Sequence, residues 1–188
     1  MQCRHELLRS GSMFGNRTKH TGDGRGPSSI LVIDRPDLPD GTAMWRIARD
    51  SGVLDLNSSY AYLLWTRDFA ETSVVARMGT EVVGFVSGYL RPNAPTTLFV
   101  WQVAVDARHR GKGVAGAMLE GLIDRAYARG ARFLETTITP ANEPSVRLFT
   151  SLARAFGVGL EYSPLFPSEL FPHGHEAEDL YRLGPWPS

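Results

Sequence analysis

The spacing of apolar residues changes from segment to segment along the chain and predicts strands that alternate with helices. Short apolar runs predict strands, and apolar positions three or four residues apart predict helices that bury one face. The strands are expected at residues 30–33, 72–78, 81–90, 98–105, 133–138, 160–166 and 177–183, and the helices at 40–51, 57–69, 114–129 and 142–156. This order predicts an α/β (α+β) protein with a mixed central sheet of about seven strands, flanked by about four helices on both faces.

Three details of this pattern bear on the fold. The run 98–105 is apolar at nearly every position, which predicts a central strand buried on both faces. A hairpin turn is expected at residues 79–80, and a proline-containing loop before the central strand. Helix starts are expected at Asp40 and Asn142, because both residue types accept hydrogen bonds from the free N–H groups of a first turn.

Residues 1–28 differ in composition from the rest of the chain. They are rich in glycine, serine and threonine and hold few residues that could pack in a core. Five basic and two acidic residues give this segment a net charge of +3. We expect a flexible N-terminal extension at 1–28, with a basic docking arm as the alternative, and one folded domain at 29–188.

The charge balance of the whole chain limits its partners. The 188 residues include 20 basic and 20 acidic ones, so the net charge is zero. Proteins that bind nucleic acid or anionic membranes usually have a basic excess, and no apolar run approaches the ~20 residues of a membrane span. The single cysteine, Cys3, can form no internal disulfide and has no neighbouring metal ligands. We therefore expect a cytoplasmic protein without nucleic-acid, membrane or metal binding.

A basic, glycine-containing turn connects the run 98–105 to the next helix. Gly111 and Gly113 allow a ligand to approach the backbone closely, and the free N–H groups at the helix start favour an anion. Arg108, Arg110 and Lys112 add positive charge, so the expected ligand is a pyrophosphate. A nucleotide triphosphatase loop needs Ser or Thr directly after its lysine, which is absent here. A dinucleotide fold places such a turn after its first strand, whereas this turn follows the fourth.

The turn resembles the acetyl-CoA-binding motif of the GNAT acetyltransferase superfamily. That motif reads Gln or Arg, two residues, Gly, one residue, Gly or Ala, and residues 108–113 of this chain read Arg-His-Arg-Gly-Lys-Gly after Val-Ala-Val-Asp. The resemblance implies that residues 29–188 form an N-acetyltransferase domain in which the pantetheine arm of acetyl-CoA lies beside the central strand. It also implies a homodimer, by analogy. The implied coenzyme-binding residues are Val103, Ala104, Val105, Arg108, Arg110, Gly111, Lys112, Gly113, Val114, Ala115 and Asn142.

Four further stretches resemble one branch of the superfamily, the L-2,4-diaminobutyrate acetyltransferases of ectoine biosynthesis. These stretches are residues 54–62, 100–105, 139–145 and 171–176. The resemblance implies that acetyl-CoA acetylates the γ-nitrogen of L-2,4-diaminobutyrate. Alternatives within enzymes are another small amine, such as a polyamine or an aminoglycoside, or a protein substrate. A non-catalytic acetyl-CoA-binding regulator is the alternative outside enzymes.

An acceptor with two ammonium groups and one carboxylate requires acids and hydrogen-bond donors at its site. The resemblance directs attention to two segments of the chain, one after the first helix and one before the last strand. The candidate substrate-binding residues are Asp55, Tyr60, Trp101, Gln102, His175 and Glu178. Five of these six also have a structural interpretation: a helix cap for Asp55, core packing for Tyr60 and Trp101, a loop residue for His175 and a solvated strand residue for Glu178.

The chemistry requires a group that accepts a proton from the attacking amine, because an alkyl ammonium has a pKa of ~10.4. The central strand holds no carboxylate, although many GNAT members place their general base there. Phe149 occupies the position where many members have a tyrosine that acts as the general acid. The hypothesis is that Glu178 or Asp55 serves the amine, with assistance from His175 or Tyr60. The thiolate can leave without an acid, since thiols have a pKa of ~8.5.

Overall fold

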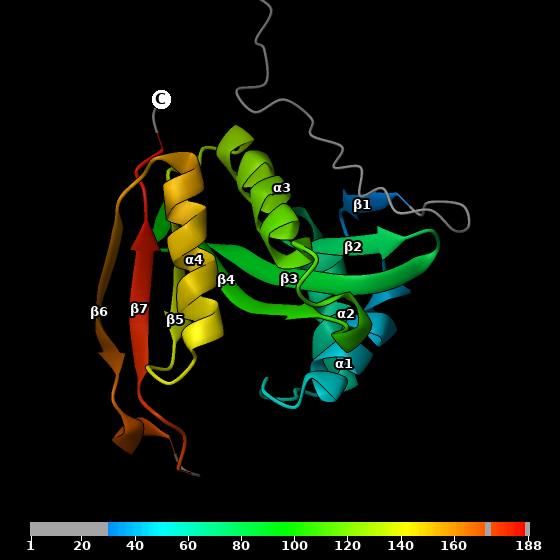
Figure 1. Ribbon diagram of the computed structural model, residues 1–188, viewed down its shortest axis with the longest axis horizontal. Coiled ribbons are helices and arrows are strands. Elements are labelled where there is room, and N and C mark those ends of the chain that lie inside the picture. The colour runs from blue at the N-terminus through cyan, green and yellow to red at the C-terminus, as the bar shows by residue number, and fades with distance from the viewer. Residues whose placement is uncertain (1–29, 172–173, 187–188) are drawn as a thin grey trace, which may run out of the picture.

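The computed structural model describes residues 30–171 and 174–186, so the extension expected at 1–28 lies outside the described residues. One seven-stranded sheet has the strand order β1-β2-β3-β4-β5-β7-β6 (Figure 1). The strands are β1 (Leu31–Asp34), β2 (Val74–Met78), β3 (Glu81–Arg91), β4 (Ala94–Val105), β5 (Phe133–Ile138), β6 (Leu160–Phe166) and β7 (Glu178–Leu183). The α-helices are α1 (Asp40–Ser51), α2 (Ser59–Asp68), α3 (Val114–Ala128) and α4 (Glu143–Phe156).

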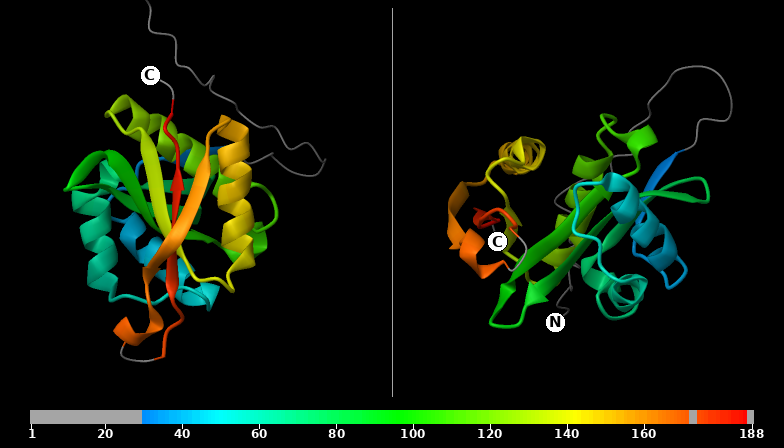
Figure 2. Two further views of the ribbon diagram at one scale, coloured as in Figure 1. Left: turned by 90° about the vertical axis from the view of Figure 1, so that its left-hand side faces the viewer. Right: turned by 90° about the horizontal axis from the view of Figure 1, so that it is seen from below.

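The sheet separates two hydrophobic cores, and this arrangement confirms the expected mixed sheet with helices on both faces. The larger core lies under α3 and α4 and includes Met118, Leu122 and Phe149. The smaller core lies under α1 and α2 and includes Met44 and Tyr62. Figure 2 shows the two helix pairs on opposite sides of the strands. Each helix buries an apolar stripe, which is the main source of its stability in a protein of this size.

The start of α1 differs from the expectation that Asp40 caps it. Pro39 stands at the cap position without a side-chain hydrogen bond, and Asp40 is the first helical residue. The carboxylate of Asp40 accepts hydrogen bonds from the backbone N–H of Asp37 and from the guanidinium of Arg77 in β2. A buried carboxylate needs such partners, and Arg77 offers a charged one that lies 37 positions away in sequence. The expected cap of α4 is confirmed, since Asn142 accepts from the N–H of Ser145 at 3.2 Å.

Strand β4 is central, as expected, but two features of the expectation for it are wrong. The strand begins at Ala94 instead of residue 98, because β3 and β4 form a long hairpin whose turn holds only residues 92–93. The strand is also not buried on both faces, since 37% of Trp101 is exposed. The apolar run therefore contains one exposed side chain, that of Trp101, although one face of its ring stacks on Trp65.

A β-bulge at Trp101 changes which residues of β4 face which core. Ser87 of β3 pairs with Gln102, and the next residue, Gly88, pairs with Val100, so Trp101 has no partner on β3. Before the bulge, Val100 faces the core under α3 and α4. After it, Gln102 and Ala104 face α1 and α2. The extra residue therefore turns both Trp101 and Gln102 towards α2, where strict alternation would separate them.

Strands β4 and β5 diverge halfway along their length (Figure 1). Their parallel pairing runs from Thr97 opposite Phe133 to Val100 opposite Thr136 and then ends. Beyond this point β4 continues to Val105 while β5 pairs with β7. The second half of β4 consequently presents one row of backbone N–H and C=O groups without a neighbouring strand, which is an edge that an extended ligand can pair with.

Candidate active site

In the loop between β4 and α3, the backbone around two glycines is accessible to a ligand. Gly111 and Gly113 have φ angles of 73° and 78°, in the left-handed region that favours glycine. A Cβ atom added at either glycine would meet no other atom within 4 Å, so the space beside both is open. Gly113 is the N-cap residue of α3, whose first N–H groups have no acceptor within the helix. The loop therefore has the geometry of an anion site at a helix start.

The basic side chains of the loop have different roles in the structure. The guanidinium of Arg108 pairs with Glu81 at 2.5 Å and with Asp106 at 3.1 Å, so carboxylates already hold it. Arg110 donates from Nε to the backbone oxygen of Val105 at 3.1 Å, on the open part of β4. Lys112 is exposed beside the two glycines. The open amides and Lys112 are thus available to an anion directly, whereas Arg108 and Arg110 would have to change partners.

Asp106 anchors this loop to the rest of the fold. Its carboxylate accepts from Arg46 of α1 at 2.9 Å, from the Arg108 side chain and from the Arg108 backbone N–H. Only 8% of the side chain is exposed. The hydrogen bonds from Arg108, and then those from Arg46, hold the pKa of Asp106 well below its usual range, although burial alone would raise it.

Removing the charge of Asp106 is expected to destabilise the protein. Asp106→Asn weakens four charge-assisted hydrogen bonds. Because Arg108 is largely exposed, we expect a cost of about 1–2 kcal/mol, or a Tm lower by about 3–6 °C. The lowered pKa makes this contribution complete above the ordinary aspartate pKa of about 3.9, and it declines as the pH falls further. Thermal unfolding at pH 7 and pH 3 measures both effects. Asp37→Asn, at an exposed carboxylate, serves as control, and an equal Tm loss at both pH values would contradict this account.

A cluster of two carboxylates and one imidazole forms on the face of the sheet that α2 partly covers. Nε2 of His175 lies 3.5 Å from Oδ2 of Asp55 and 3.8 Å from Oε1 of Glu178. Nδ1 of His175 lies 2.7 Å from the backbone oxygen of Glu176, and its ring lies tilted by 31° against that of Phe171, with centroids 4.5 Å apart. The structure therefore brings together three candidates that the sequence separates by up to 123 positions, from 55 to 178.

The two carboxylates of this cluster differ in environment. The side chain of Asp55 is 85% exposed, whereas that of Glu178 is 17% exposed and its Oε2 is buried without a hydrogen-bond partner among the described residues. Burial raises the pKa of Glu178, against the opposing effects of Thr137 and His175. The hydrogen bond to the Glu176 carbonyl, and then the nearby carboxylates, raise the pKa of His175. A partly desolvated carboxylate with a raised pKa is suited to proton transfer.

The remaining candidates of the acceptor region are found in three different settings. Tyr60, in the first turn of α2, is 65% exposed and does not pack in the core. Trp101 stacks on Trp65 of α2 with ring centroids 5.0 Å apart, so one of its faces is held by packing. The side chain of Gln102 is buried and bonded at both ends, accepting from the Tyr62 hydroxyl and donating to the Asp55 carbonyl.

Tyr62 is a residue of this region that the sequence did not single out. It lies fully buried on α2, two positions after Tyr60, and its hydroxyl donates to Oε1 of Gln102 at 3.2 Å. Burial raises its pKa, so it remains a neutral donor. The helical periodicity of α2 predicts Tyr62 as a core residue, and only the bulge that turns Gln102 towards α2 makes it part of the site. No signal in the sequence indicates that bulge.

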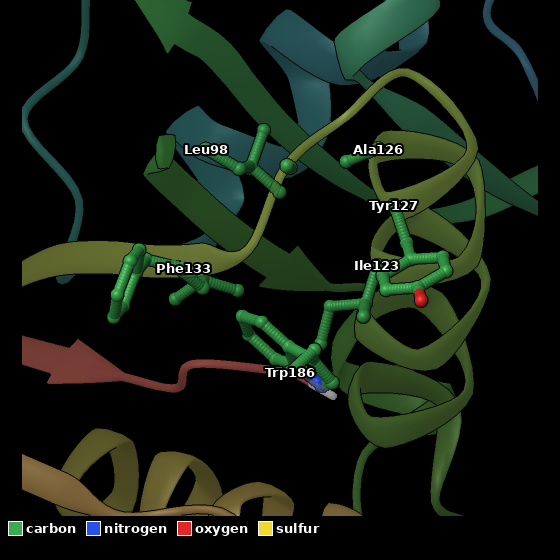
Figure 3. A pocket seen from close by; sticks show the side chains of 8 residues that line it. Leu98, Ile123, Ala126, Tyr127, Phe133 and Trp186 are labelled. Carbon is green, nitrogen blue, oxygen red and sulfur yellow. The ribbon is translucent and has the colours of Figure 1, made fainter. Parts of the chain in front are cut away.

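Two hollows in the surface lie elsewhere. One is an apolar pocket lined by Leu98, Ile123, Ala126, Tyr127, Ala131, Phe133, Leu134 and Trp186 (Figure 3). It belongs to the core side of the sheet, whereas Glu178 points to the opposite face, because Tyr181 and Leu183 of the same strand face the core. The other hollow lies between α1 and the β4–α3 loop, where Arg46, Asp106 and Arg110 line it.

The described residues contain no cluster of three or more His, Cys, Asp or Glu side chains that could hold a metal ion. None of the helices in the same part of the chain is long and apolar enough to cross a bilayer. Phe149 is buried, and as a hydrocarbon ring it can donate no proton. The groups that can do chemistry in this region are therefore the cluster of Asp55, His175 and Glu178, which we call the acceptor cluster, the open edge of β4 and the amides of the β4–α3 loop.

Comparison with known proteins agrees with this geometry. Residues 42–153 match the acetyltransferase (GNAT) family. The chain is 60% identical to an L-2,4-diaminobutyric acid acetyltransferase of Streptomyces coelicolor over 158 residues, 82% of this chain and 93% of that one. It is 44% identical to the enzyme of the same name from Marinococcus halophilus over 170 residues, 90% of this chain and 98% of that one.

Solved structures give the same result. The diaminobutyrate acetyltransferase EctA from Paenibacillus lautus, in complex with its substrate L-2,4-diaminobutyric acid and coenzyme A, superposes with a TM-score of 0.81 at 42% identity. The match covers 85% of this chain and 98% of that one. Ard1 from Thermoplasma volcanium shares the fold, with a TM-score of 0.70 at 19% identity, 82% of this chain and 97% of that one. The chain belongs to the GNAT acetyltransferase family, in the branch of its L-2,4-diaminobutyric acid acetyltransferase relatives.

Proposed function

We propose that this protein transfers the acetyl group of acetyl-CoA to the γ-nitrogen of L-2,4-diaminobutyrate, giving N4-acetyl-L-2,4-diaminobutyrate for ectoine biosynthesis. The observation that supports this most is the Asp55–His175–Glu178 cluster. It lies on the face of the sheet where Trp101 is exposed, near the point where β4 and β5 diverge. Relatives at up to 60% identity carry this activity in their names, and the Paenibacillus lautus enzyme holds both the amine and coenzyme A.

The coenzyme is expected to occupy the open edge of β4 and the loop after it. The pantetheine amides would pair with the backbone of Val103 and Val105, and the pyrophosphate would lie on the amides around Gly111 and Gly113. Because Arg110 covers the Val105 carbonyl, it would move from β4 to the phosphates when the coenzyme binds. The full set that we assign to the coenzyme is Val103, Ala104, Val105, Arg108, Arg110, Gly111, Lys112, Gly113, Val114, Ala115 and Asn142.

The acceptor is expected to bind between α2 and β7. Its two ammonium groups would face the carboxylates of Asp55 and Glu178, and the exposed face of Trp101 would contact a cationic group or the methylene chain. The hydroxyl of Tyr60, which is exposed in the first turn of α2, and the imidazole of His175 would offer hydrogen bonds to the acceptor. A site with two acids and an aromatic wall favours a small diamine over a neutral amine, since the partly buried carboxylate of Glu178 would otherwise lose more of its hydration without gaining a charged partner.

In the reaction, Glu178 accepts a proton from the γ-ammonium group, and the neutral nitrogen attacks the thioester carbonyl. The N–C bond forms, a backbone N–H of β4 near Val103 stabilises the negative charge on the carbonyl oxygen, and the C–S bond then breaks. The nitrogen, which is positively charged after the attack, loses its second proton to water, and this leaves the neutral amide. The thiolate of CoA leaves without an acid, because thiols have a pKa of ~8.5. Phe149, at the position where the resemblance to other GNAT enzymes places a tyrosine, can donate no proton. His175, between Glu178 and Asp55, stabilises the carboxylates and can pass the proton to solvent.

The family also supports a cytoplasmic homodimer as part of this proposal, since a biosynthetic enzyme that uses acetyl-CoA acts where that coenzyme is made. A zero net charge fits a partner set limited to small molecules. Size-exclusion chromatography with light scattering would detect a mass of twice the 20.7 kDa chain for a dimer.

An amine panel tests the proposed acceptor. The release of free thiol from acetyl-CoA is measured with L-2,4-diaminobutyrate, its D-enantiomer, L-ornithine, putrescine and an aminoglycoside. We expect kcat/KM for L-2,4-diaminobutyrate to exceed that for L-ornithine at least tenfold, because one methylene changes binding by about 1–3 kcal/mol. A polyamine or aminoglycoside that is turned over faster would replace the proposed substrate, and coenzyme binding without thiol release would indicate a regulator.

A further inference from the structure

We propose that Tyr62 and Gln102 are positioning residues that hold Asp55 at the acceptor site, so that they control the affinity for the amine without contacting it. This inference rests on the proposed function, because it assigns Asp55 to the amine. The observation behind it is a continuous set of contacts from the core of α2 to the acceptor cluster: Tyr62 to Gln102, Gln102 to the Asp55 carbonyl, and the Asp55 carboxylate to His175.

Asp55 needs such support because its own segment is irregular. It lies between the end of α1 at Ser51 and the cap of α2 at Ser58, where no strand or helix orders the backbone. Its side chain is 85% exposed, so no packing around the carboxylate fixes its direction. The bond from Gln102 to the Asp55 carbonyl, at 3.1 Å, ties the middle of this segment to the central strand. The same carbonyl also accepts a hydrogen bond from Nδ2 of Asn57 at 3.2 Å, within the segment itself. Of these two bonds, the one from Gln102 links Asp55 to the central strand.

Gln102 is in turn fixed from the other side. The amide is buried, with its oxygen accepting from Tyr62 at 3.2 Å and its nitrogen donating to Asp55, so its orientation is determined by two partners of opposite type. Tyr62 is fully buried and packs edge to face on Phe85 of β3, which holds the phenol in one position. The Tyr62 hydroxyl is therefore a donor in a fixed position. Because it orients the Gln102 amide, it also restrains the loop that contains Asp55.

The same contacts argue against a direct role of Gln102 in binding the amine, which the sequence alone suggested. Its carbonyl oxygen and one N–H are used within the protein, and its side chain is 5% exposed. Trp101, the preceding residue, is the exposed member of the pair because the bulge presents both to the same face at different depths. The bulge thus places Trp101 where it can contact the acceptor and Gln102 where it positions Asp55.

The experiment compares Gln102→Met and Tyr62→Phe with the wild-type enzyme. Gln102→Met keeps the length of the side chain and removes both hydrogen bonds, and Tyr62→Phe removes one hydroxyl from the core. We expect KM for L-2,4-diaminobutyrate to rise about tenfold in Gln102→Met and about threefold in Tyr62→Phe, because a displaced binding group costs affinity. The Kd of CoA and kcat should stay within about twofold, since the coenzyme loop does not depend on these contacts.

Two controls separate positioning from a loss of stability. Thr66→Val removes another buried hydroxyl of α2, which donates to the carbonyl of Leu63 within the same helix. This variant should have a lower Tm and an unchanged KM for both substrates. In the Asp55→Ala background, Gln102→Met should raise KM for the amine by less than twofold, because the carboxylate that it positions is gone. An unchanged KM in folded Gln102→Met and Tyr62→Phe, equal effects on both substrates, or effects that multiply with Asp55→Ala would overturn the inference.

Hydrogen exchange tests the positioning role of Tyr62 even if L-2,4-diaminobutyrate is not the substrate. Amides of residues 53–58 should exchange faster in Tyr62→Phe than in the wild type and in Thr66→Val, since the loop is then held less firmly. Unchanged exchange in this segment would refute the positioning role. Absence of any turnover of L-2,4-diaminobutyrate by the wild type, with faster exchange in Tyr62→Phe, would refute the proposed function and leave the structural role of Tyr62 in place.

Discussion

Replacing Glu178 with glutamine is expected to lower kcat/KM for L-2,4-diaminobutyrate by about 10²- to 10⁴-fold, the range that a positioned proton acceptor contributes. The substitution keeps the shape of the side chain and its burial but removes the basic oxygen. The Kd of CoA should change little, because Glu178 lies on β7 beside His175, whereas we assign the phosphates of the coenzyme to the β4–α3 loop. Steady-state kinetics and calorimetric CoA binding measure the two quantities.

The pH dependence gives a second test of the same residue. Glu178 acts as a base only when deprotonated, so activity falls as the pH falls through its pKa. Burial raises that pKa, which places the acidic limb of kcat/KM above the ordinary glutamate value of about 4.3. The limb should disappear in Glu178→Gln. The exposed neighbour Glu176 offers a matched control, and a Glu178→Gln enzyme as active as Glu176→Gln would exclude Glu178 as the base.

The second large effect is expected at the coenzyme loop. Gly111→Asp places a negative charge beside the amides that we assign to the pyrophosphate, and aspartate tolerates the positive φ of 73° better than most residues do. A like charge at about 5 Å in an effective dielectric of about 20 costs about 3 kcal/mol. The Kd of CoA should therefore rise about 100-fold or more, as measured by calorimetry.

Two matched variants identify the cause of that loss. Gly111→Asn has nearly the same size without the charge and should weaken CoA binding much less. Gly79→Asp carries the same change in the β2–β3 turn, where φ is 62° and a Cβ atom would likewise meet nothing within 4 Å. Gly79→Asp should bind CoA like the wild type. If Gly111→Asp binds CoA as tightly as Gly79→Asp, the phosphates do not lie on this loop.

The features predicted best from sequence are those with a local physical signal. The order of strands and helices follows from apolar periodicity, and the start of α4 follows from the ability of Asn142 to accept a backbone hydrogen bond. The loop at Gly111 and Gly113 is equally local, because both glycines have the positive φ that glycine-rich turns require. The branch of the family could be identified because its characteristic stretches are short and contiguous.

The features that the sequence could not show depend on pairing between distant segments. The bulge at Trp101 arises from the register of β3 against β4, and a shift of one position changes the face of every later residue. Without the bulge, Gln102 cannot be assigned to the side of Tyr62. The capture of Arg108 by Asp106 and Glu81 likewise requires the β2–β3 hairpin beside the loop, so the sequence indicated only a free cation.

The most direct test of the account is the identity of the product. The wild-type protein is mixed with L-2,4-diaminobutyrate and acetyl-CoA labelled with ¹³C in the acetyl group, and the products are analysed by mass spectrometry and NMR. We expect one labelled acetyl group on the γ-nitrogen for each free CoA released. Label on the α-nitrogen, label only on the protein, or no transfer at all would contradict the assignment of this chain as a diaminobutyrate acetyltransferase.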